Sequence, residues 1–117
     1  MKIGFIGLGN VGGKLSGSLL RNWHDVAVHD LDAALVAAKV ADGARDGGSP
    51  AALMQSCDAV ITCLPSPAAS AAVMEEMLPN VGPGKIWMEM STTDAAEGKR
   101  LGADVFARGC AAVDCPV

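Results

Sequence analysis

Residues 1–12 read MKIGFIGLGNVG, an apolar segment that runs directly into a glycine-rich turn. The apolar residues 1–7 predict a β-strand that starts at the first residue. After the glycines, Val11, Leu15 and Leu19 recur at four-residue spacing, which is typical of one face of a helix. The stretch therefore predicts a strand, a tight glycine turn and a helix in immediate succession.

The turn carries the spacing G-x-G-x-x-G at Gly7, Gly9 and Gly12. Gly7 lets the chain leave the strand sharply, Gly9 lets a pyrophosphate approach the backbone, and Gly12 lets the helix pack closely on the sheet. A bound pyrophosphate would face the free N–H groups at the helix N-terminus, where the helix dipole favours an anion. The alternative is that the glycines serve only turns and helix packing. The candidate dinucleotide-binding loop consists of Gly7, Leu8, Gly9, Asn10, Val11 and Gly12.

An acidic residue follows the loop at the distance that dinucleotide binding requires. A second strand over 25–30 ends in Asp30, 18 residues after Gly12. A carboxylate at this place can accept both hydroxyls of the adenosine ribose, and it would repel a 2′-phosphate. No arginine stands beside it, since the next two residues are Leu31 and Asp32. The sequence therefore predicts NAD as the cofactor, with NADP less favoured.

The rest of the chain alternates between predicted strands and helices. Such alternation indicates an α/β fold with a doubly wound parallel sheet, a Rossmann NAD(P)-binding domain of about six strands with helices on both faces. We assign a single dinucleotide-binding domain to residues 1–117. The remaining predicted strands are 43–45, 58–64, 85–90 and 110–113. The remaining predicted helices are 33–40, one that starts at Ser49-Pro50, 68–78, and one from a capping-box-like Asp94 and Glu97 to about Arg108.

Composition excludes several classes of function. A net charge of −4 and an aromatic content of 3% argue against nucleic-acid binding, which needs a basic face or stacking platforms. No apolar run approaches the ~18 residues of a membrane span, and the start of the chain is not a signal peptide, so we expect a cytoplasmic protein without a membrane partner. The four cysteines form no C-x-x-C pair and are expected to be free thiols, with no metal site.

Several further segments carry a resemblance to a known family. They are residues 4–9 with the glycine loop, Gly43-Ala44 followed by Ser49-Pro50, the strand 58–65 that ends in Leu-Pro, Ser91-Thr92, and the Asp-Cys-Pro-Val of 114–117. Together they resemble the first domain of the β-hydroxyacid dehydrogenase family, which includes 3-hydroxyisobutyrate dehydrogenase and, more distantly, 6-phosphogluconate dehydrogenase. The resemblance runs along essentially the whole chain.

The resemblance implies a function and assigns further residues. It implies the NAD-binding domain of an oxidoreductase that transfers hydride between NAD and a small 3-hydroxyacid. Leu64 and Pro65 would line the cofactor groove at the carboxyl end of the fourth strand, and Thr92 would lie near the nicotinamide half. The alternatives are that Leu64-Pro65 is only a strand end and that Ser91-Thr92 only caps a helix.

The chain departs from the family pattern at several positions. Val11 replaces a common methionine, Ala69 a common polar residue, and Ala95 the usual proline. Trp23 stands where a glycine usually closes the first helix, so we expect Asn22 to adopt the left-handed cap.

The substrate signature of the family continues beyond Val117. The helix that bears the family's catalytic lysine has no counterpart here, and none of the four lysines at 14, 39, 85 and 99 matches it. We therefore assign no catalytic residue. We expect the helical catalytic and dimerisation domain to be absent and the 117-residue chain to be inactive by itself.

Two other functions are open from the sequence. The chain could be a non-catalytic nucleotide-binding or interaction module derived from the same family, which self-associates through the exposed side that follows the last strand. It could also be a Rossmann domain for flavin or S-adenosylmethionine, although the Leu-Pro and Ser-Thr segments argue against this.

Overall fold

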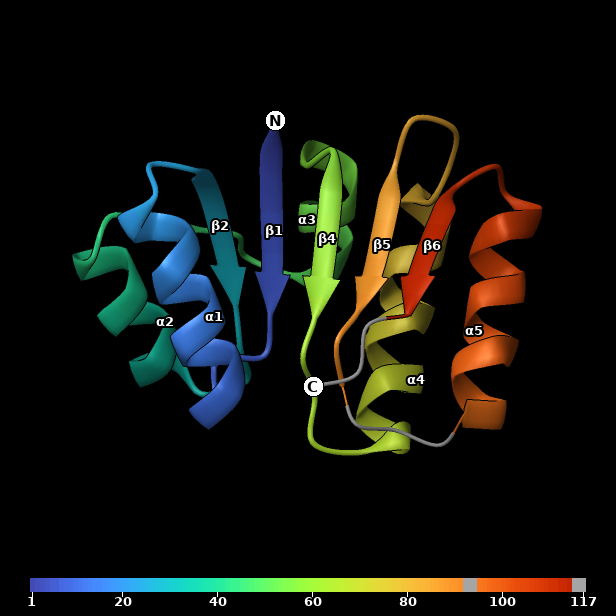
Figure 1. Ribbon diagram of the computed structural model, residues 1–117, viewed down its shortest axis with the longest axis horizontal. Coiled ribbons are helices and arrows are strands. Elements are labelled where there is room, and N and C mark those ends of the chain that lie inside the picture. Colours follow the sequence, from blue (N-terminus) through green and yellow to red (C-terminus); the bar gives the residue numbers. More distant parts are fainter. Residues whose placement is uncertain (92–94, 115–117) are drawn as a thin grey trace.

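The computed structural model describes residues 1–91 and 95–114, and its centre is a six-stranded parallel sheet in the order β3-β2-β1-β4-β5-β6 (Figure 1). The order reverses between β1 and β4, which is the arrangement of a doubly wound fold. The predicted α/β Rossmann architecture is therefore confirmed. The strands are β1 Lys2–Ile6, β2 Asp25–His29, β3 Arg45–Asp46, β4 Ala59–Thr62, β5 Ile86–Glu89 and β6 Ala111–Asp114.

Helices cover both faces of this sheet, as predicted. The bounds are α1 Asn10–Arg21, α2 Ala33–Ala41, α3 Pro50–Ser56, α4 Pro67–Met77 and α5 Ala95–Ala107, with a 3-10 turn η1 at Leu78–Asn80. One core cluster joins β1 and β2 to α1 and α2 around Phe5, Val28 and Val36. A second cluster joins β4 and β5 to α3, α4 and α5 on the opposite face around Leu53 and Trp87.

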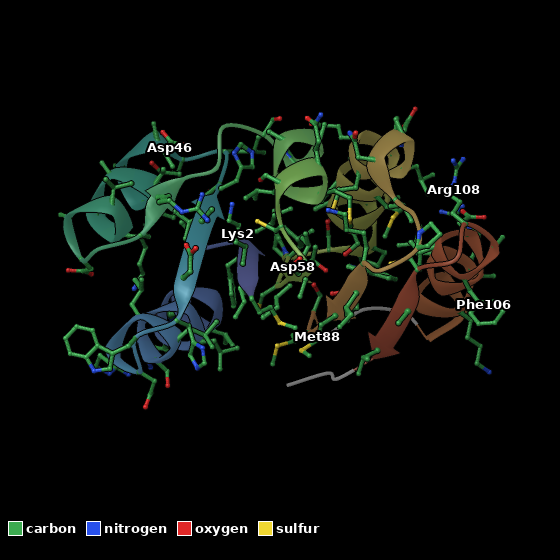
Figure 2. All side chains as sticks on the ribbon, turned by 90° about the horizontal axis from the view of Figure 1, so that it is seen from above. Lys2, Asp46, Asp58, Met88, Phe106 and Arg108 are labelled. Carbon is green, nitrogen blue, oxygen red and sulfur yellow. The ribbon has the colours of Figure 1, made fainter. Side chains whose placement is uncertain are left out.

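The two halves of the sheet are covered unequally. Figure 1 shows α1 and α2 beside β2 on one side of the sheet, whereas α4 and α5 lie behind or beside β5 and β6. Met88 of β5 is half-buried and points away from the face that α4 covers (Figure 2). Phe106 of α5 is largely exposed, and its side chain points away from the sheet (Figure 2). Among the described residues, no helix covers the face of β5 and β6 from which Met88 projects (Figure 1, Figure 2).

Serine side chains cap two helices, of which the sequence analysis identified the first. The Ser49 hydroxyl accepts the backbone N–H of Ala52 at 3.1 Å, and Pro50 occupies the first turn of α3. Ser66 caps α4 in the same way, through the N–H of Ala69 at 3.1 Å. The capping box expected at Asp94 and Glu97 lies outside the described side chains.

The end of α1 differs from the prediction. Asn22 has a φ of −97°, and its side-chain amide donates to the Ser18 carbonyl oxygen at 2.7 Å. Trp23 takes the left-handed conformation instead, with a φ of +65°. Its N–H and that of His24 bond to the carbonyl groups of Leu20 and Leu19, the pattern of a Schellman cap. Asn22 is therefore one position too early to be the left-handed residue, and the prediction was wrong.

None of the helices among the described residues is both long and apolar enough to cross a membrane.

Candidate functional site

A groove of about 640 Å³ runs along the carboxyl ends of the strands, where the sheet order reverses. In open α/β sheets this edge is the place where ligands bind. The structure brings eight of the ten predicted site residues together along its wall: Gly7, Gly9, Asn10, Val11, Gly12, Asp30, Leu64 and Pro65. Leu8 is buried against the α1 and α2 face and does not line the groove, and Thr92 lies outside the described residues.

Two of the three motif glycines are required by close backbone approach. Gly7 has a φ of +99°, and a side chain on it would overlap the carbonyl oxygen of Cys63. A side chain on Gly12 would overlap the carbonyl oxygen of Gly7. Gly9 differs, because a Cβ on it would meet no atom within 4 Å. The side chain missing at Gly9 therefore leaves open space on the groove side of the loop.

The N-terminus of α1 is free to receive an anion. Gly9 is the N-cap residue and supplies no side-chain hydrogen bond, and the first turn carries no acidic residue. The first N–H groups of a helix have no partner within it, and the helix dipole places partial positive charge there. Because Asn10, Val11 and Gly12 line the groove, these donors lie on its wall.

Asp30 ties the glycine loop to the turn after β2. Its Oδ2 accepts the N–H of Leu8 at 2.8 Å, and its Oδ1 accepts the N–H of Asp32 at 2.8 Å. Each carboxylate oxygen has a second lone pair, so both can still accept a hydroxyl from a ligand. Among the described residues, no lysine or arginine lines the groove that could offset this charge.

A hydrogen-bonded chain of polar groups holds the other end of the groove. The N–H of Leu64 donates to the Ser91 hydroxyl at 2.6 Å, and the N–H of Ser91 donates to Glu89 Oε1 at 2.7 Å. The turns that follow β4 and β5 are thereby joined. Sequence reasoning named Ser91 only within a motif, since its contact with Leu64 spans 27 residues and leaves no local signal. It missed Glu89, because nothing in the sequence shows that this carboxyl group is buried.

Cys63 lines this end of the groove as a neutral thiol. Burial raises its pKa above the ordinary value, and the negative charge of Glu89 raises it further. A thiol with a raised pKa is a poor nucleophile at neutral pH. The three described cysteines, Cys57, Cys63 and Cys110, form no disulfide.

One face of α4 forms a wall that the sequence analysis did not identify. The lining residues Ala69, Ala72, Val73 and Glu76 follow the i, i+3, i+4, i+7 spacing of a helix face. Ala69, noted above as a departure from the family pattern, belongs to this wall. Its helical spacing directly after Leu-Pro is visible in the sequence, although the sequence does not show which face of the helix meets the groove. Across the groove, the fully exposed Leu31 lies beside Asp30.

The comparison with protein families gives a match over nearly the whole chain. The model of the family described as the NAD binding domain of 6-phosphogluconate dehydrogenase matches residues 2–117.

Individual relatives agree with this match. The chain is 33% identical to the cytokine-like nuclear factor N-PAC of Homo sapiens, over 99% of this chain and 22% of that protein. It is 30% identical to a probable mitochondrial 3-hydroxyisobutyrate dehydrogenase of Dictyostelium discoideum, over 98% of this chain and 37% of that protein. The chain thus spans between about a fifth and two fifths of the length of these relatives.

Among solved structures, the 3-hydroxyisobutyrate dehydrogenase of Mycobacterium tuberculosis with L-serine superposes with a TM-score of 0.91. The sequence identity is 27%, and the match covers 99% of this chain and 40% of that chain. The fold is therefore shared along the whole length described here.

Proposed function

Because the chain belongs to the family of NAD-binding domains of 6-phosphogluconate dehydrogenase, we propose that it binds a nicotinamide dinucleotide in the groove. In the whole protein it would orient this cofactor for hydride transfer to or from a small 3-hydroxyacid, as in 3-hydroxyisobutyrate dehydrogenase. The observation that carries the proposal is the uncapped N-terminus of α1 behind Gly9, which faces open space beside Asp30.

The glycine loop would hold the pyrophosphate. Gly9 leaves room for a phosphate to approach the backbone, and the free N–H groups at the start of α1 would donate to its oxygens. Gly7 and Gly12 act indirectly, since they allow β1, the loop and α1 to pack at the required distance. Leu8 contributes its N–H to Asp30 rather than a wall of the groove.

Asp30 would select NAD over NADP. Its two oxygens are held in place by the N–H groups of Leu8 and Asp32, and their free lone pairs would accept the hydroxyls of the adenosine ribose. A 2′-phosphate would bring a second negative charge to this carboxylate, and no described cation on the groove wall offsets it. Like charges in contact disfavour binding, which supports NAD as the cofactor.

The nicotinamide half would lie over the ends of β4 and β5, along Leu64, Pro65 and the Ser91-Thr92 segment. The cofactor supplies the hydride chemistry, while this chain supplies binding and orientation. No lysine is among the described residues that line the groove, and we assign the acid or base that acts on the substrate hydroxyl to no residue of this chain. We therefore expect the chain by itself to turn over no hydroxyacid. Location in the cytoplasm and self-association through the open β5–β6 face stay predictions.

A second candidate function is a non-catalytic nucleotide-binding module. The observation that favours it is the 33% identity to the nuclear factor N-PAC, whose name describes no dehydrogenase. The identity to the probable dehydrogenase is similar, at 30%. Both candidates require cofactor binding and differ only in catalysis by the whole protein.

Calorimetric titration of the chain with NAD⁺ and, separately, NADP⁺ tests the proposal. Saturable binding of NAD⁺ with weaker binding of NADP⁺ is expected. Absence of binding to both would contradict the proposed function, whereas tighter binding of NADP⁺ would contradict only the selective role of Asp30. Activity of the whole protein with small 3-hydroxyacids distinguishes the enzyme from the non-catalytic module.

A further inference from the structure

Glu89 is a buried carboxyl group directly beneath the groove. It is the last residue of β5, and only 2% of it is exposed to solvent. Burying a charged group costs free energy unless hydrogen bonds or an opposite charge compensate for it. The partners of this carboxyl group therefore indicate what it is for.

Hydrogen bonds account for one of its two oxygens. Oε1 accepts the N–H of Ser91 at 2.7 Å, and the Ser91 hydroxyl in turn accepts the N–H of Leu64 at 2.6 Å. Oε2 is buried and makes no hydrogen bond in the part of the chain that the structure describes. A purely structural tie would need only the first oxygen, so half of the carboxylate has no structural explanation.

The charge of Glu89 reaches the wall of the groove. Cys63 and Ser91 both line the groove, and the negative charge of Glu89 contributes to the raised pKa of the Cys63 thiol. Lys85 precedes the first residue of β5, at the end of the strand away from Glu89, and donates to the carbonyl groups of Gln55 and Cys57. No described cation on the groove wall compensates for the carboxylate at its own end.

The position of Glu89 identifies which part of a dinucleotide would experience this charge. A doubly wound sheet binds one mononucleotide over each of its halves. The glycine loop and Asp30 occupy the β1–β2 half, so the nicotinamide falls on the β4–β5 half, where Glu89 lies. The nicotinamide ring carries a positive charge when it is oxidised and none when it is reduced. A fixed negative charge nearby interacts favourably with the first form only.

We propose that Glu89 makes the groove discriminate between the two redox states of the cofactor and favour the oxidised one. This inference rests on the proposed function, because it requires that a nicotinamide dinucleotide binds here. Glu89 positions Ser91 by accepting its N–H, and its charge acts on the nicotinamide ring. The two roles are separable by substitution.

The experiment compares the dissociation constants of NAD⁺ and NADH for four forms of the chain in about 0.15 M salt. Glu89→Gln removes the charge and keeps an oxygen that can accept the Ser91 N–H. Ser91→Ala removes the tie to Leu64 and keeps the charge. Glu75→Gln is the matched control, because Glu75 is exposed on α4, does not line the groove, and its substitution changes the net charge equally.

The wild-type chain is expected to bind NAD⁺ more tightly than NADH. Glu89→Gln should weaken NAD⁺ binding about tenfold and leave NADH binding within about twofold, a loss expected for a partly shielded charge pair. Ser91→Ala should weaken both forms alike, and Glu75→Gln should change neither.

The outcomes separate this inference from the proposed function. If both forms bind and Glu89→Gln leaves the ratio of the two constants unchanged, the inference is overturned while the proposed function stands. A wild-type chain that binds NADH as tightly as NAD⁺ overturns it as well, even if Glu89→Gln does not fold. If neither form binds, the proposed function itself fails.

Discussion

The two halves of the sheet build their parts of the groove by different means. On the β1–β3 half, the backbone makes the site: Gly7 and Gly12 allow close approach, and the start of α1 supplies donors. On the β4–β6 half, side chains make it, through the bonds that connect Leu64, Ser91 and Glu89. The first half therefore fails when a side chain is added at Gly7 or Gly12, whereas the second half fails when one bonding partner is removed.

Gly12→Ala tests the backbone side of the comparison and has the largest expected effect. The added Cβ would overlap the carbonyl oxygen of Gly7, so the loop or α1 must shift. We expect the free energy of unfolding to fall by about 3 kcal/mol, as in severe overpacking, and NAD⁺ binding to be lost. Chemical denaturation and calorimetric titration measure the two effects.

Gly9→Ala is the matched control for this prediction. Its Cβ would meet no protein atom within 4 Å, so the free energy of unfolding should change by less than about 0.5 kcal/mol. NAD⁺ binding should still weaken, because the methyl group occupies the space of the pyrophosphate. If Gly9→Ala lost as much stability as Gly12→Ala, the distinction between a glycine needed for packing and a glycine needed only for binding would be wrong.

Asp30→Ala tests the one side chain that we assign to cofactor binding on the β1–β3 half of the sheet. The loss of hydrogen bonds to a charged acceptor should weaken NAD⁺ binding by about 2 kcal/mol, or roughly thirtyfold. NADP⁺ should lose less, since the repulsion of its 2′-phosphate disappears with the carboxylate. Titration with both cofactors measures the change in selectivity, and an equal loss for both would contradict the assigned role.

Ser91→Ala tests the side-chain side of the comparison by its effect on stability. It leaves the N–H of Leu64 without its partner, so we expect the free energy of unfolding to fall by about 1–2 kcal/mol. Ser56→Ala is the control, because the exposed Ser56 hydroxyl donates to the Ala52 carbonyl within α3 and contacts the Cys57 sulfur, and no backbone N–H donates to it among the described residues. Urea denaturation of both variants gives the comparison, and equal effects would show that the Ser91 bond is unimportant.

Trp23→Gly has the smallest expected effect and the opposite sign. Trp23 is left-handed and 95% exposed, so its side chain provides little packing to offset the backbone strain. Gly43 and Gly109 take positive φ at the same place after α2 and α5. Glycine should raise the free energy of unfolding by about 1 kcal/mol. Asn22→Gly should give no such gain, because the φ of Asn22 is negative.

The same contrast explains which features the sequence could predict. The alternation of strands and helices, the glycine loop and the position of Asp30 depend on residues close in the chain, and their spacing alone indicates them. Trp23 was missed because cap preferences favour Asn over Trp, whereas the place where α1 ends decides which residue is left-handed. Leu8 was predicted to contact the cofactor because it lies inside the motif, although its side chain is buried in the core cluster that includes α1 and α2.

The contribution of Glu89 could not be predicted in this way. Its importance depends on burial and on the contact between Leu64 and Ser91, residues that are distant in the sequence. The α4 wall lies between these cases, since its helical spacing was visible but nothing in the sequence shows which face of α4 meets the groove.

Mapping of amide NMR shifts during titration with NAD⁺ tests the central claim most directly. The account predicts the largest changes at the N–H groups of residues 9–12, with further changes around Asp30 and Leu64. Residues on the open β5–β6 face, such as Met88, should change little. Changes centred on that face, with an unaffected glycine loop, would contradict the account.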